Sequence, residues 1–399
     1  MNRRGTTWTA IAFLLALALM LGYVLLLVCL GKSSLWDAAR QLQPSLTSFT
    51  AFTNQSEAAL NDDLDRKHLF IQLYGGVQRL CGKRVIEDKA LSAKVLKLST
   101  GTLNFYYSAN DVDISPMAQK TNYFSDALDD LGIAYLYIAA PQKIQAGEEE
   151  TLLPSGIQEY SNRNADQFLS LLQQHGTDTY DLRPLFSSRG HYEDWFFRTD
   201  HHWKPEAAFY AWQSVAQVLS EHYGIETDPK YLREESWQKR VYQDYFLGSQ
   251  GKRTGSLYAG VDDITEYIPT FDTWFTYDSP SFSQPRIGPF HQSLLFPERV
   301  AQRDWFNGNP YTLYAGGDYG IATITNHQNL SGKKILLLRE SFSCAFTPFL
   351  ALSCSQLTTV DLRYFEGDLM KTIQEVNPDL VITLYCVSSI SNQILFSFS

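Results

Sequence analysis

The sequence predicts an α/β fold in which a parallel sheet is flanked by helices. Three short apolar runs in the last part of the chain, at residues 334–338, 356–363 and 379–385, have the length of buried strands. Helix-like stretches at residues 347–352 and 368–376 separate these runs. Because strands that alternate with helices usually pair in parallel, this order of elements indicates a parallel sheet with helices on its faces.

The N-terminal region has the pattern of a membrane anchor. Residues 8–30 carry no charge and, at about 1.5 Å per residue, are long enough to cross a bilayer core of roughly 30 Å. Arg3 and Arg4 precede this segment, and positive residues stay in the cytoplasm, so the remaining chain is expected outside the cell. A cleaved signal peptide is the alternative, but its apolar core is normally about 7–15 residues long and ends at small residues.

We therefore expect three regions along the chain. Residues 1–31 form a cytoplasmic tail and an uncleaved, single-pass anchor, and the polar residues 32–67 form a membrane-proximal stalk. Residues 68–399 form one extracellular domain.

The first part of this domain continues the alternation of elements. Residues 70–74 suit a strand or a short helix that ends in a turn at Gly75 and Gly76. Further elements follow in order: helices are expected at 123–131, 159–174 and 205–223, and strands at 133–141 and 179–182. The helix at 205–223 is the clearest, because it starts with proline and stops before Gly224.

Residues 228–308 differ from the rest, because they are dense in aromatic residues and turns. We expect them to form an insertion at one end of the sheet, with a loop at residues 248–255. Aromatic side chains fill cores first, but Tyr and Trp also suit the faces of sugars. Both roles are open for this insertion.

Charge and cysteine content exclude several classes of protein. The formal net charge of −10 argues against a nucleic-acid surface, which needs a basic patch. Five cysteines, one of them Cys29 in the anchor, are too sparse for a disulfide scaffold and match no zinc signature. Buried free thiols are expected, although a Cys344–Cys354 bridge is possible.

The chemistry is expected in two places. Residues 199–203 read Thr-Asp-His-His-Trp, and an Asp two residues before a His can orient an imidazole that acts as a general base. A metal site is the alternative, but adjacent side chains usually diverge and no HExxH or Cys-rich partner is present, so no metal is expected. Ser341 follows the strand at 334–338, where a turn into a helix exposes a hydroxyl. The alternative is that Ser341 or Ser343 only caps that helix.

Several segments together resemble the Asp-His-His-Trp family, relatives of the alginate O-acetyltransferase proteins with SGNH-hydrolase-like domains. The matching segments are residues 199–203, Ser-Phe-Ser at 341–343, Tyr-Ala-Gly-Gly at 314–317, Val-Asp-Leu-Arg-Tyr at 360–364 and Asn-Pro-Asp-Leu-Val at 377–381. The resemblance implies an SGNH-like fold and a Ser-His-Asp triad. Asp200 would orient His202, His202 would deprotonate Ser341, and Ser341 would carry an acetyl group. His201 is given no catalytic step.

The groups that bind the substrate are less clearly marked. The sequence has Arg-Glu-Ser at 339–341 in place of the Gly-Asp-Ser block of ordinary SGNH enzymes. The backbone amides of Ser341 and of Gly316 or Gly317 are candidates for an oxyanion hole, although the glycines alone could simply turn the chain. Arg363 could bind a carboxylate or an acidic sugar, or could form an internal ion pair.

The resemblance implies an O-acetyltransferase that modifies a cell-surface or exported polysaccharide without a cofactor. A membrane-bound O-acyltransferase is implied as the partner that donates the acetyl group. Two alternatives are open: a carbohydrate acetylesterase of the same fold, and a non-catalytic scaffold or carbohydrate-binding subunit.

Overall fold

The computed structural model describes residues 67–88 and 93–398, together with the isolated positions 15, 18 and 22. The chain divides into two units, Met1–Ile71 and Gln72–Ser399. Apart from the isolated positions and Lys67, the predicted anchor at 8–30 and the predicted stalk at 32–67 lie outside the described residues. Among the residues that are described, no helix combines the length and the apolar character needed to cross a membrane.

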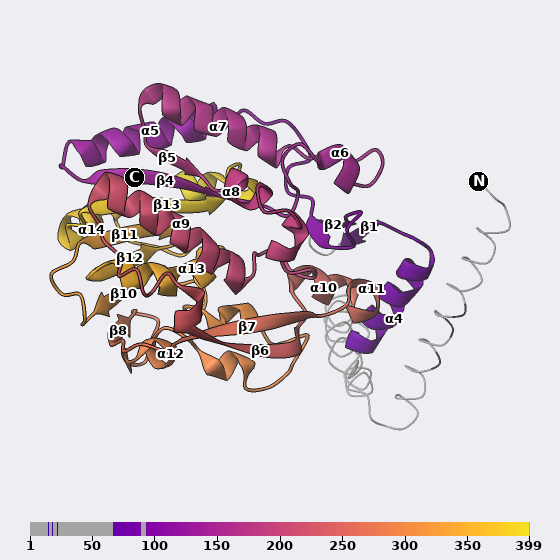
Figure 1. The fold of residues 1–399 in the computed structure, drawn as a ribbon. Coiled ribbons are helices and arrows are strands. Elements are labelled where there is room, and N and C mark those ends of the chain that lie inside the picture. The colour runs from indigo at the N-terminus through magenta and orange to yellow at the C-terminus, as the bar shows by residue number, and fades with distance from the viewer. Residues whose placement is uncertain (1–14, 16–17, 19–21, 23–66, 89–92, 399) are drawn as a thin grey trace, which may run out of the picture. The chain divides into compact units, whose positions relative to one another are not determined.

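The second unit is built on a mixed sheet of eight strands in the order β5-β4-β13-β11-β12-β10-β8-β9 (Figure 1). The strands are β4 (Ala134–Ala140), β5 (Thr179–Asp181), β8 (Phe275–Asp278), β9 (Arg286–Gly288), β10 (Ile321–Asn326), β11 (Lys334–Arg339), β12 (Gln356–Val360) and β13 (Leu380–Cys386). From β5 to β12 neighbouring strands are parallel, whereas β10, β8 and β9 pair antiparallel. The prediction of a parallel sheet is therefore wrong at one edge. There, β8 and β9 are joined by a link too short for the crossover that parallel strands need.

Helices cover both faces of this sheet, as the sequence predicts. On one face lie α5 (Ser115–Asp129), α7 (Ser161–His175) and α14 (Leu369–Val376), and on the other lie α9 (Pro205–Tyr223) and α13 (Ser343–Leu350) (Figure 1). Successive residues of a strand point to opposite faces. In β11, accordingly, Ile335 and Leu337 pack with α9 and α13, while Leu336 and Leu338 pack with α5, α7 and α14.

Each helix predicted after residue 80 overlaps an observed helix, although α5 and α13 begin earlier than predicted. Helix α9 has its predicted bounds, and Gly224 follows it in the left-handed conformation. Helix α4 (Lys67–Leu80) runs through Gly75 and Gly76, so the predicted turn there is wrong. A Cβ on Gly75 would lie 1.8 Å from the carbonyl oxygen of Thr254, so this glycine permits a close backbone approach.

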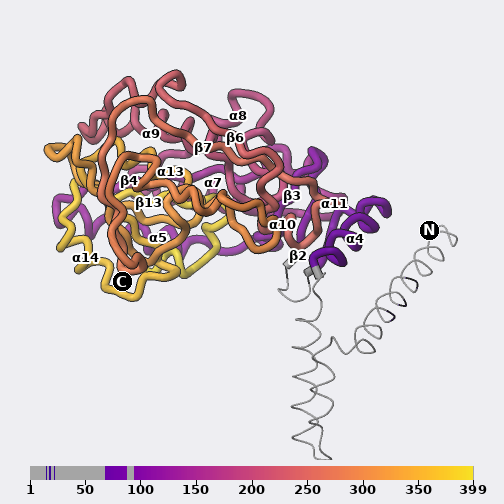
Figure 2. The backbone as a smooth tube through the Cα atoms, turned by 90° about the horizontal axis from the view of Figure 1, so that it is seen from below, coloured from indigo at the N-terminus to yellow at the C-terminus, as the bar shows by residue number. Residues whose placement is uncertain are grey.

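Smaller elements complete the second unit. Two further sheets consist of β1 (Val85–Asp88), β2 (Ala93–Lys97) and β3 (Leu103–Phe105), and of β6 (Trp237–Phe246) and β7 (Asp262–Pro269). The short helices are α6 (Glu149–Leu152), α8 (Arg183–Ser187), α10 (Ser249–Thr254), α11 (Ser256–Ala259) and α12 (Phe290–Ser293). Residues 72–80 of α4 lie beside α10 and α11, at the end of this unit away from the C-terminus (Figures 1 and 2).

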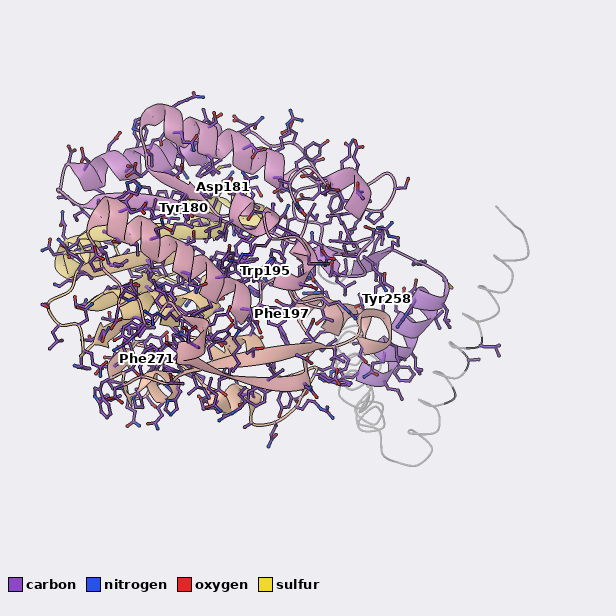
Figure 3. The ribbon with its side chains drawn as sticks, in the orientation of Figure 1. Tyr180, Asp181, Trp195, Phe197, Tyr258 and Phe271 are labelled. Carbon is purple, nitrogen blue, oxygen red and sulfur yellow. The ribbon has the colours of Figure 1, made fainter. Side chains whose placement is uncertain are left out.

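The segment at 228–308 is more closely integrated than the predicted insertion. Its strands β8 and β9 extend the main sheet, and only β6 and β7 form a separate ribbon. Trp237, Tyr267 and Phe290 pack around Phe349 of α13, with ring centroids 5.5 to 6.0 Å apart. Phe271 stacks on Tyr231 at 4.3 Å (Figure 3 labels Phe271). These aromatic side chains fill the core, which is the first of the two roles left open by the sequence.

The described cysteines are free thiols, as expected, and Cys344 and Cys354 form no bridge, but the expected burial is wrong for Cys81. Cys344, Cys354 and Cys386 are buried and free, and Cys81 is exposed and free. Cys29 lies outside the described residues.

Candidate active site

Ser341 lies at the carboxyl end of β11, in the turn that leads into α13. The turn is closed by hydrogen bonds from the amide of Ser343 to the carbonyl of Glu340 (3.0 Å) and from the amide of Cys344 to the carbonyl of Ser341 (3.1 Å). Neither serine caps the helix, because the N-cap residue is Phe342 and the Ser343 hydroxyl bonds the carbonyl of Leu384. The hydroxyl of Ser341 is therefore free to take part in another interaction.

The Asp-His-His-Trp segment forms a short loop before α9. An antiparallel bridge joins Phe196 to Trp203, and the amide of Lys204 donates to the carbonyl of Trp195 at 2.8 Å. Trp195 in turn stacks on Tyr210 of α9 at 5.3 Å (Figure 3 labels Trp195). The base of the loop is thus fixed to the helix that follows, and the residues between Phe196 and Trp203 form its tip.

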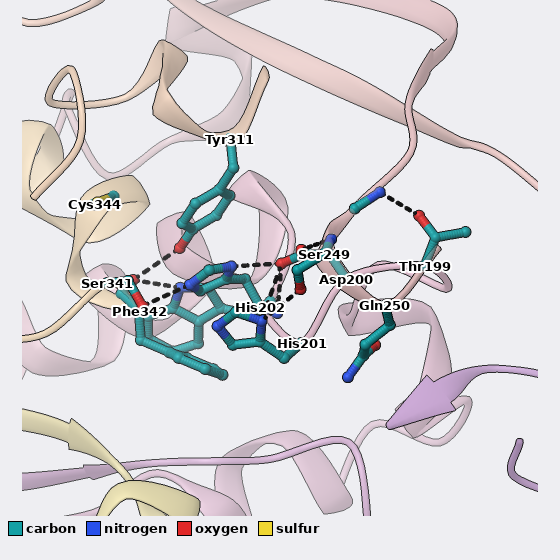
Figure 4. A network of polar contacts seen from close by, with 12 residues as sticks. Thr199, Asp200, His201, His202, Ser249, Gln250, Tyr311, Ser341, Phe342 and Cys344 are labelled. Atoms are coloured by element: carbon teal, nitrogen blue, oxygen red, sulfur yellow. Dashed lines mark hydrogen bonds and ion pairs between the residues drawn. The ribbon is translucent and has the colours of Figure 1, made fainter. Parts of the chain in front are cut away.

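Asp200, His202 and Ser341 are connected by hydrogen bonds, as Figure 4 shows. Oδ1 of Asp200 lies 2.5 Å from Nδ1 of His202, and Nε2 of His202 lies 2.8 Å from Oγ of Ser341. Asp200 is 3% exposed and His202 is 7% exposed, whereas Ser341 is partly accessible. The structure therefore brings together the three residues that the sequence selects, in the expected order.

The environment of Asp200 keeps its carboxyl group ionised. Burial by itself raises the pKa of Asp200, but His201, His202 and the amide of Ser249 bring the pKa well below its ordinary value. The amide of Ser249 donates to Oδ2 at 2.7 Å, and the amide of His202 donates to Oδ1 at 3.1 Å. A Cβ on Gly248 would lie 2.2 Å from the Cβ of Asp200, so this close approach requires glycine.

Residues 249–254, expected to be part of a loop, instead form helix α10. The prediction for 248–255 is wrong because this segment packs closely on the Asp200 loop. The amide of Gly251 donates to the carbonyl of Thr199 at 2.8 Å, and the amide of Gly248 donates to the Thr199 hydroxyl at 2.8 Å.

Tyr311 and Trp203 join the His202 loop to the Ser341 turn. The ring of His202 stacks on Tyr311, which lies in the 3-10 helix Pro310–Leu313, with centroids 4.0 Å apart and planes 13° apart. The Tyr311 hydroxyl and the Trp203 indole N–H donate to the carbonyl of Phe342, at 3.0 and 2.8 Å. These contacts fix the separation of His202 and Ser341, and the sequence gives no sign of the role of Tyr311.

Asp262, the first residue of β7, holds the tip of the loop. Its carboxylate accepts hydrogen bonds from the amides of Arg198 and Thr199, both at 2.7 Å, and from the Thr199 hydroxyl at 2.6 Å. Because Asp200 follows directly, this carboxylate fixes the backbone that carries the acid.

His201 lies beside the chain of hydrogen bonds but is not part of it. Its Nδ1 is 3.1 Å from the Ser249 hydroxyl, and its side chain is 24% exposed. Burial, reinforced by the neighbouring His202, lowers the pKa of His201. We therefore expect a neutral imidazole that packs against the site.

The side chains of the alternative metal site lie closer together than the sequence predicts. Asp200, His201 and His202 offer ligand atoms within 4.8 Å of one another, so these adjacent side chains converge. However, hydrogen bonds already engage both oxygens of Asp200 and both ring nitrogens of His202. In this arrangement a proton can pass from Ser341 to His202 without any of these side chains moving.

A buried group of charges lies next to the Ser341 turn. Arg339 is 1% exposed, and its guanidinium donates to the carbonyl of Gly317 at 2.9 Å and pairs with Asp318. Arg363 forms two hydrogen bonds with Asp361, at 2.9 and 2.6 Å, and pairs with Asp318 at 3.1 Å. Arg363 thus forms the internal ion pair that the sequence left open beside a substrate-binding role.

Gly316 and Gly317 lie in the loop that carries Asp318. Both have positive φ, 74° and 127°, and a Cβ on Gly316 would lie 2.5 Å from the ring of Phe296. Within the described part of the chain, the amides of Ser341, Gly316 and Gly317 donate no hydrogen bond. Ser341 is partly accessible, whereas Gly316 and Gly317 are buried.

Comparison with known proteins shows which proteins this chain resembles. Residues 104–251, which include Asp200 and His202 but not Ser341, match the SGNH hydrolase-like domain of acetyltransferase AlgX. The alginate biosynthesis protein AlgX of Pseudomonas aeruginosa is 31% identical over 115 residues, which is 29% of this chain. Over these segments the chain is similar to SGNH hydrolase-like proteins. The match spans 23% of the length of AlgX.

Solved structures support the fold over most of the chain. PatB1 of Bacillus cereus, in a structure with a sulfonyl adduct, superimposes with a TM-score of 0.64 at 22% identity over 77% of this chain and 99% of that chain. A DHHW family protein from Eubacterium siraeum superimposes with a TM-score of 0.58 at 17% identity over 79% and 96% of the two chains. The predicted resemblance is confirmed, and the family match together with the likeness to PatB1 supports the SGNH-like α/β fold.

The ion pair of Asp318 with Arg339 gives the first prediction, which concerns stability. We expect Asp318→Asn to lower the free energy of unfolding by about 3 kcal/mol, because it leaves the buried guanidinium of Arg339 without its carboxylate. Burial raises the pKa of Asp318, but Arg339 and Arg363 bring it below its ordinary value. The stabilisation is therefore present above the ordinary carboxyl pKa of about 4 and is lost as the pH falls through the lower folded value.

Denaturant unfolding at neutral and acidic pH measures both effects. Asp228→Asn is the matched control, because Asp228 forms an exposed pair with Lys230 and is expected to contribute less than about 1 kcal/mol. Equal losses of unfolding free energy in the two variants, or a difference between the two losses that grows as the pH falls, would contradict this account.

Proposed function

We propose that this protein is an O-acetyltransferase that modifies a cell-surface or exported polysaccharide through an acetyl-Ser341 intermediate. The observation that carries the proposal is the hydrogen-bonded series from Asp200 through His202 to Ser341. A buried acid, an imidazole and a partly accessible serine in this order are the parts of a nucleophilic triad.

In the first half of the proposed reaction, Ser341 takes up an acetyl group. Nε2 of His202 accepts the hydroxyl proton as Oγ of Ser341 attacks the acetyl carbonyl carbon and forms the ester bond. His202 then gives this proton to the leaving group of the donor. Asp200 holds the N–H of His202 at Nδ1, so that Nε2 is the nitrogen that accepts.

In the second half, the same groups act in reverse. His202 removes the proton from a sugar hydroxyl, which attacks acetyl-Ser341, and the proton returns to Oγ of Ser341 as the ester bond breaks. The unpaired amides of Ser341 and of Gly316 or Gly317 are the proposed donors to the oxyanion in both steps.

The similarity to AlgX supports the substrate class. That protein bears the name of alginate biosynthesis, and its domain that of an acetyltransferase. For this chain we extend the proposal to an extracellular unit, anchored by residues 8–30 and supplied with acetyl groups by a membrane-bound O-acyltransferase. The uncharged N-terminal segment after Arg3 and Arg4 supports the anchored topology.

The test separates transfer from hydrolysis and from a scaffold role. Full-length protein is incubated with an acetyl ester and candidate oligosaccharides, and free acetate and acetylated sugar are measured separately. We expect acetylated sugar to exceed free acetate and to disappear in Ser341→Ala. Acetate alone would favour the esterase. Saturable sugar binding that Ser341→Ala leaves unchanged, without turnover, would favour the scaffold.

A further inference from the structure

The carboxyl group of Glu340 lies against the proposed nucleophile and has no part in the triad. Glu340 stands between the end of β11 and Ser341 and is 5% exposed. Its Oε1 accepts the backbone N–H of Cys386, the last residue of β13, at 3.0 Å. Its Oε2 lies 3.3 Å from Oγ of Ser341. A buried acid thus faces the reacting oxygen atom with one oxygen and is anchored through the other.

The effect of the contact between Glu340 and Ser341 depends on which of the groups around Oγ carry a proton. Ser341 has one hydroxyl proton, while Nε2 of His202 at 2.8 Å and Oε2 of Glu340 at 3.3 Å both face Oγ. If Glu340 were ionised, its carboxylate would compete with His202 for that proton and would place a negative charge beside the developing oxyanion. If Glu340 is neutral, Oε2 carries a proton, because Oε1 already accepts an N–H.

We propose that Glu340 acts as a neutral carboxylic acid that donates a hydrogen bond from Oε2 to Oγ of Ser341 and so directs the serine proton to His202. This inference rests on the proposed function only in taking Ser341 as the nucleophile. As Oγ attacks, its proton passes to Nε2 of His202 and its electron pair forms the new bond. Glu340 keeps its own proton throughout and stabilises the negative charge that builds on Oγ during both attack and departure.

The surroundings of Glu340 favour its neutral form. Burial raises its pKa and the carboxylate of Asp318 adds to the rise, while Arg363, the N–H of Cys386 and His202 oppose it, with a net shift upward. The phenols of four tyrosines also interact with this group: Tyr107, Tyr137, Tyr311 and Tyr385. All four phenols have raised pKa values, so they are neutral in the range where Glu340 titrates.

Two neutral substitutions of Glu340 test whether the hydrogen bond that it donates to Ser341 is needed. Glu340→Gln keeps a neutral N–H donor for Ser341 and an acceptor for Cys386, whereas Glu340→Met keeps the volume and removes both. The probe is phenylmethylsulfonyl fluoride, and the readout is the second-order rate of Ser341 sulfonylation by intact-protein mass, corrected with Ser341→Ala. We expect Glu340→Gln to stay within about threefold of the unmodified protein and Glu340→Met to lose about 10²-fold, as for other donors to a reacting oxygen.

The pH dependence distinguishes this role from a merely structural one. In the unmodified protein the rate is expected to fall as the pH rises through the raised pKa of Glu340, and this fall should be absent in Glu340→Gln. Glu366→Gln, which changes an exposed acid after β12, is the control and should keep the fall. Thermal unfolding of each variant is measured alongside.

Three results would overturn the proposal. These are a folded Glu340→Gln as slow as Glu340→Met, a folded Glu340→Met as fast as the unmodified protein, and a fall of the rate with rising pH that Glu340→Gln retains. Sulfonylation needs neither acetyl donor nor sugar. A protein that is sulfonylated at Ser341 but never acetylates a sugar would therefore count against the proposed function alone.

Discussion

Replacing Ser341 by alanine is expected to abolish acyl-enzyme formation, and replacing His202 by glutamine is expected to reduce its rate roughly 10⁴- to 10⁶-fold. Without Oγ there is no atom to carry the acetyl group, and without Nε2 of His202 there is no group 2.8 Å away to take the proton. The double variant should be no more impaired than Ser341→Ala alone, because the two residues act in one step. Intact-protein mass after incubation with an activated acetyl ester measures the acetylated fraction over time.

His201→Ala is the matched control for this experiment. His201 is adjacent in sequence, but it contacts Ser249 and not Ser341. We expect at most about a tenfold loss, caused by looser packing of the loop. Thermal unfolding of all variants excludes misfolding as the cause. An inactive His201→Ala protein beside an active His202→Gln protein would reverse the assignment of the base.

The central features of the candidate site could be predicted because they are local in the sequence. Asp200 and His202 stand in one short motif, and Ser341 stands at the end of an apolar strand. Residue type and position made all three candidates, and the family resemblance joined them in one triad. The alternation of apolar runs and helices similarly predicted β4, β11 and β13 and the helices that cover them.

The supporting residues could not be found in this way, because their roles depend on contacts between distant segments. Tyr311 lies 109 positions from the histidine on which it stacks, Asp262 lies 63 positions from Thr199, and neither stands in a motif. The strands β8, β9 and β10 and their antiparallel pairing were not predicted, for a related reason. These strands are short, and antiparallel pairing depends on the connections and the partner strand more than on composition.

Asp200→Asn is expected to lower the rate of Ser341 sulfonylation about 10³- to 10⁴-fold while leaving most of the fold intact. Asp200 accepts hydrogen bonds from Nδ1–H and the amide of His202 through Oδ1, and from the amide of Ser249 through Oδ2. An asparagine has one acceptor oxygen and one NH₂ group, so it cannot accept on both sides. If the oxygen bonds the amide of Ser249, the NH₂ group faces Nδ1 of His202. The imidazole then carries its proton on Nε2 and cannot accept one from Ser341.

The loss should be accompanied by a change in pH dependence. The pKa of Asp200 lies well below its ordinary value, so in the unmodified protein the carboxylate that holds the Nδ1–H of His202 stays ionised down to strongly acidic pH. In alkali, hydroxide can take the Ser341 proton in place of Nε2 of His202, so Asp200→Asn should recover partially. The control is Asp194→Asn, an exposed acid just before the same loop, which should keep the unmodified rate and profile. A folded Asp200→Asn protein that is sulfonylated at the unmodified rate would show that another group fixes the tautomer of His202, and Asp200 would then be only a structural anchor of the loop.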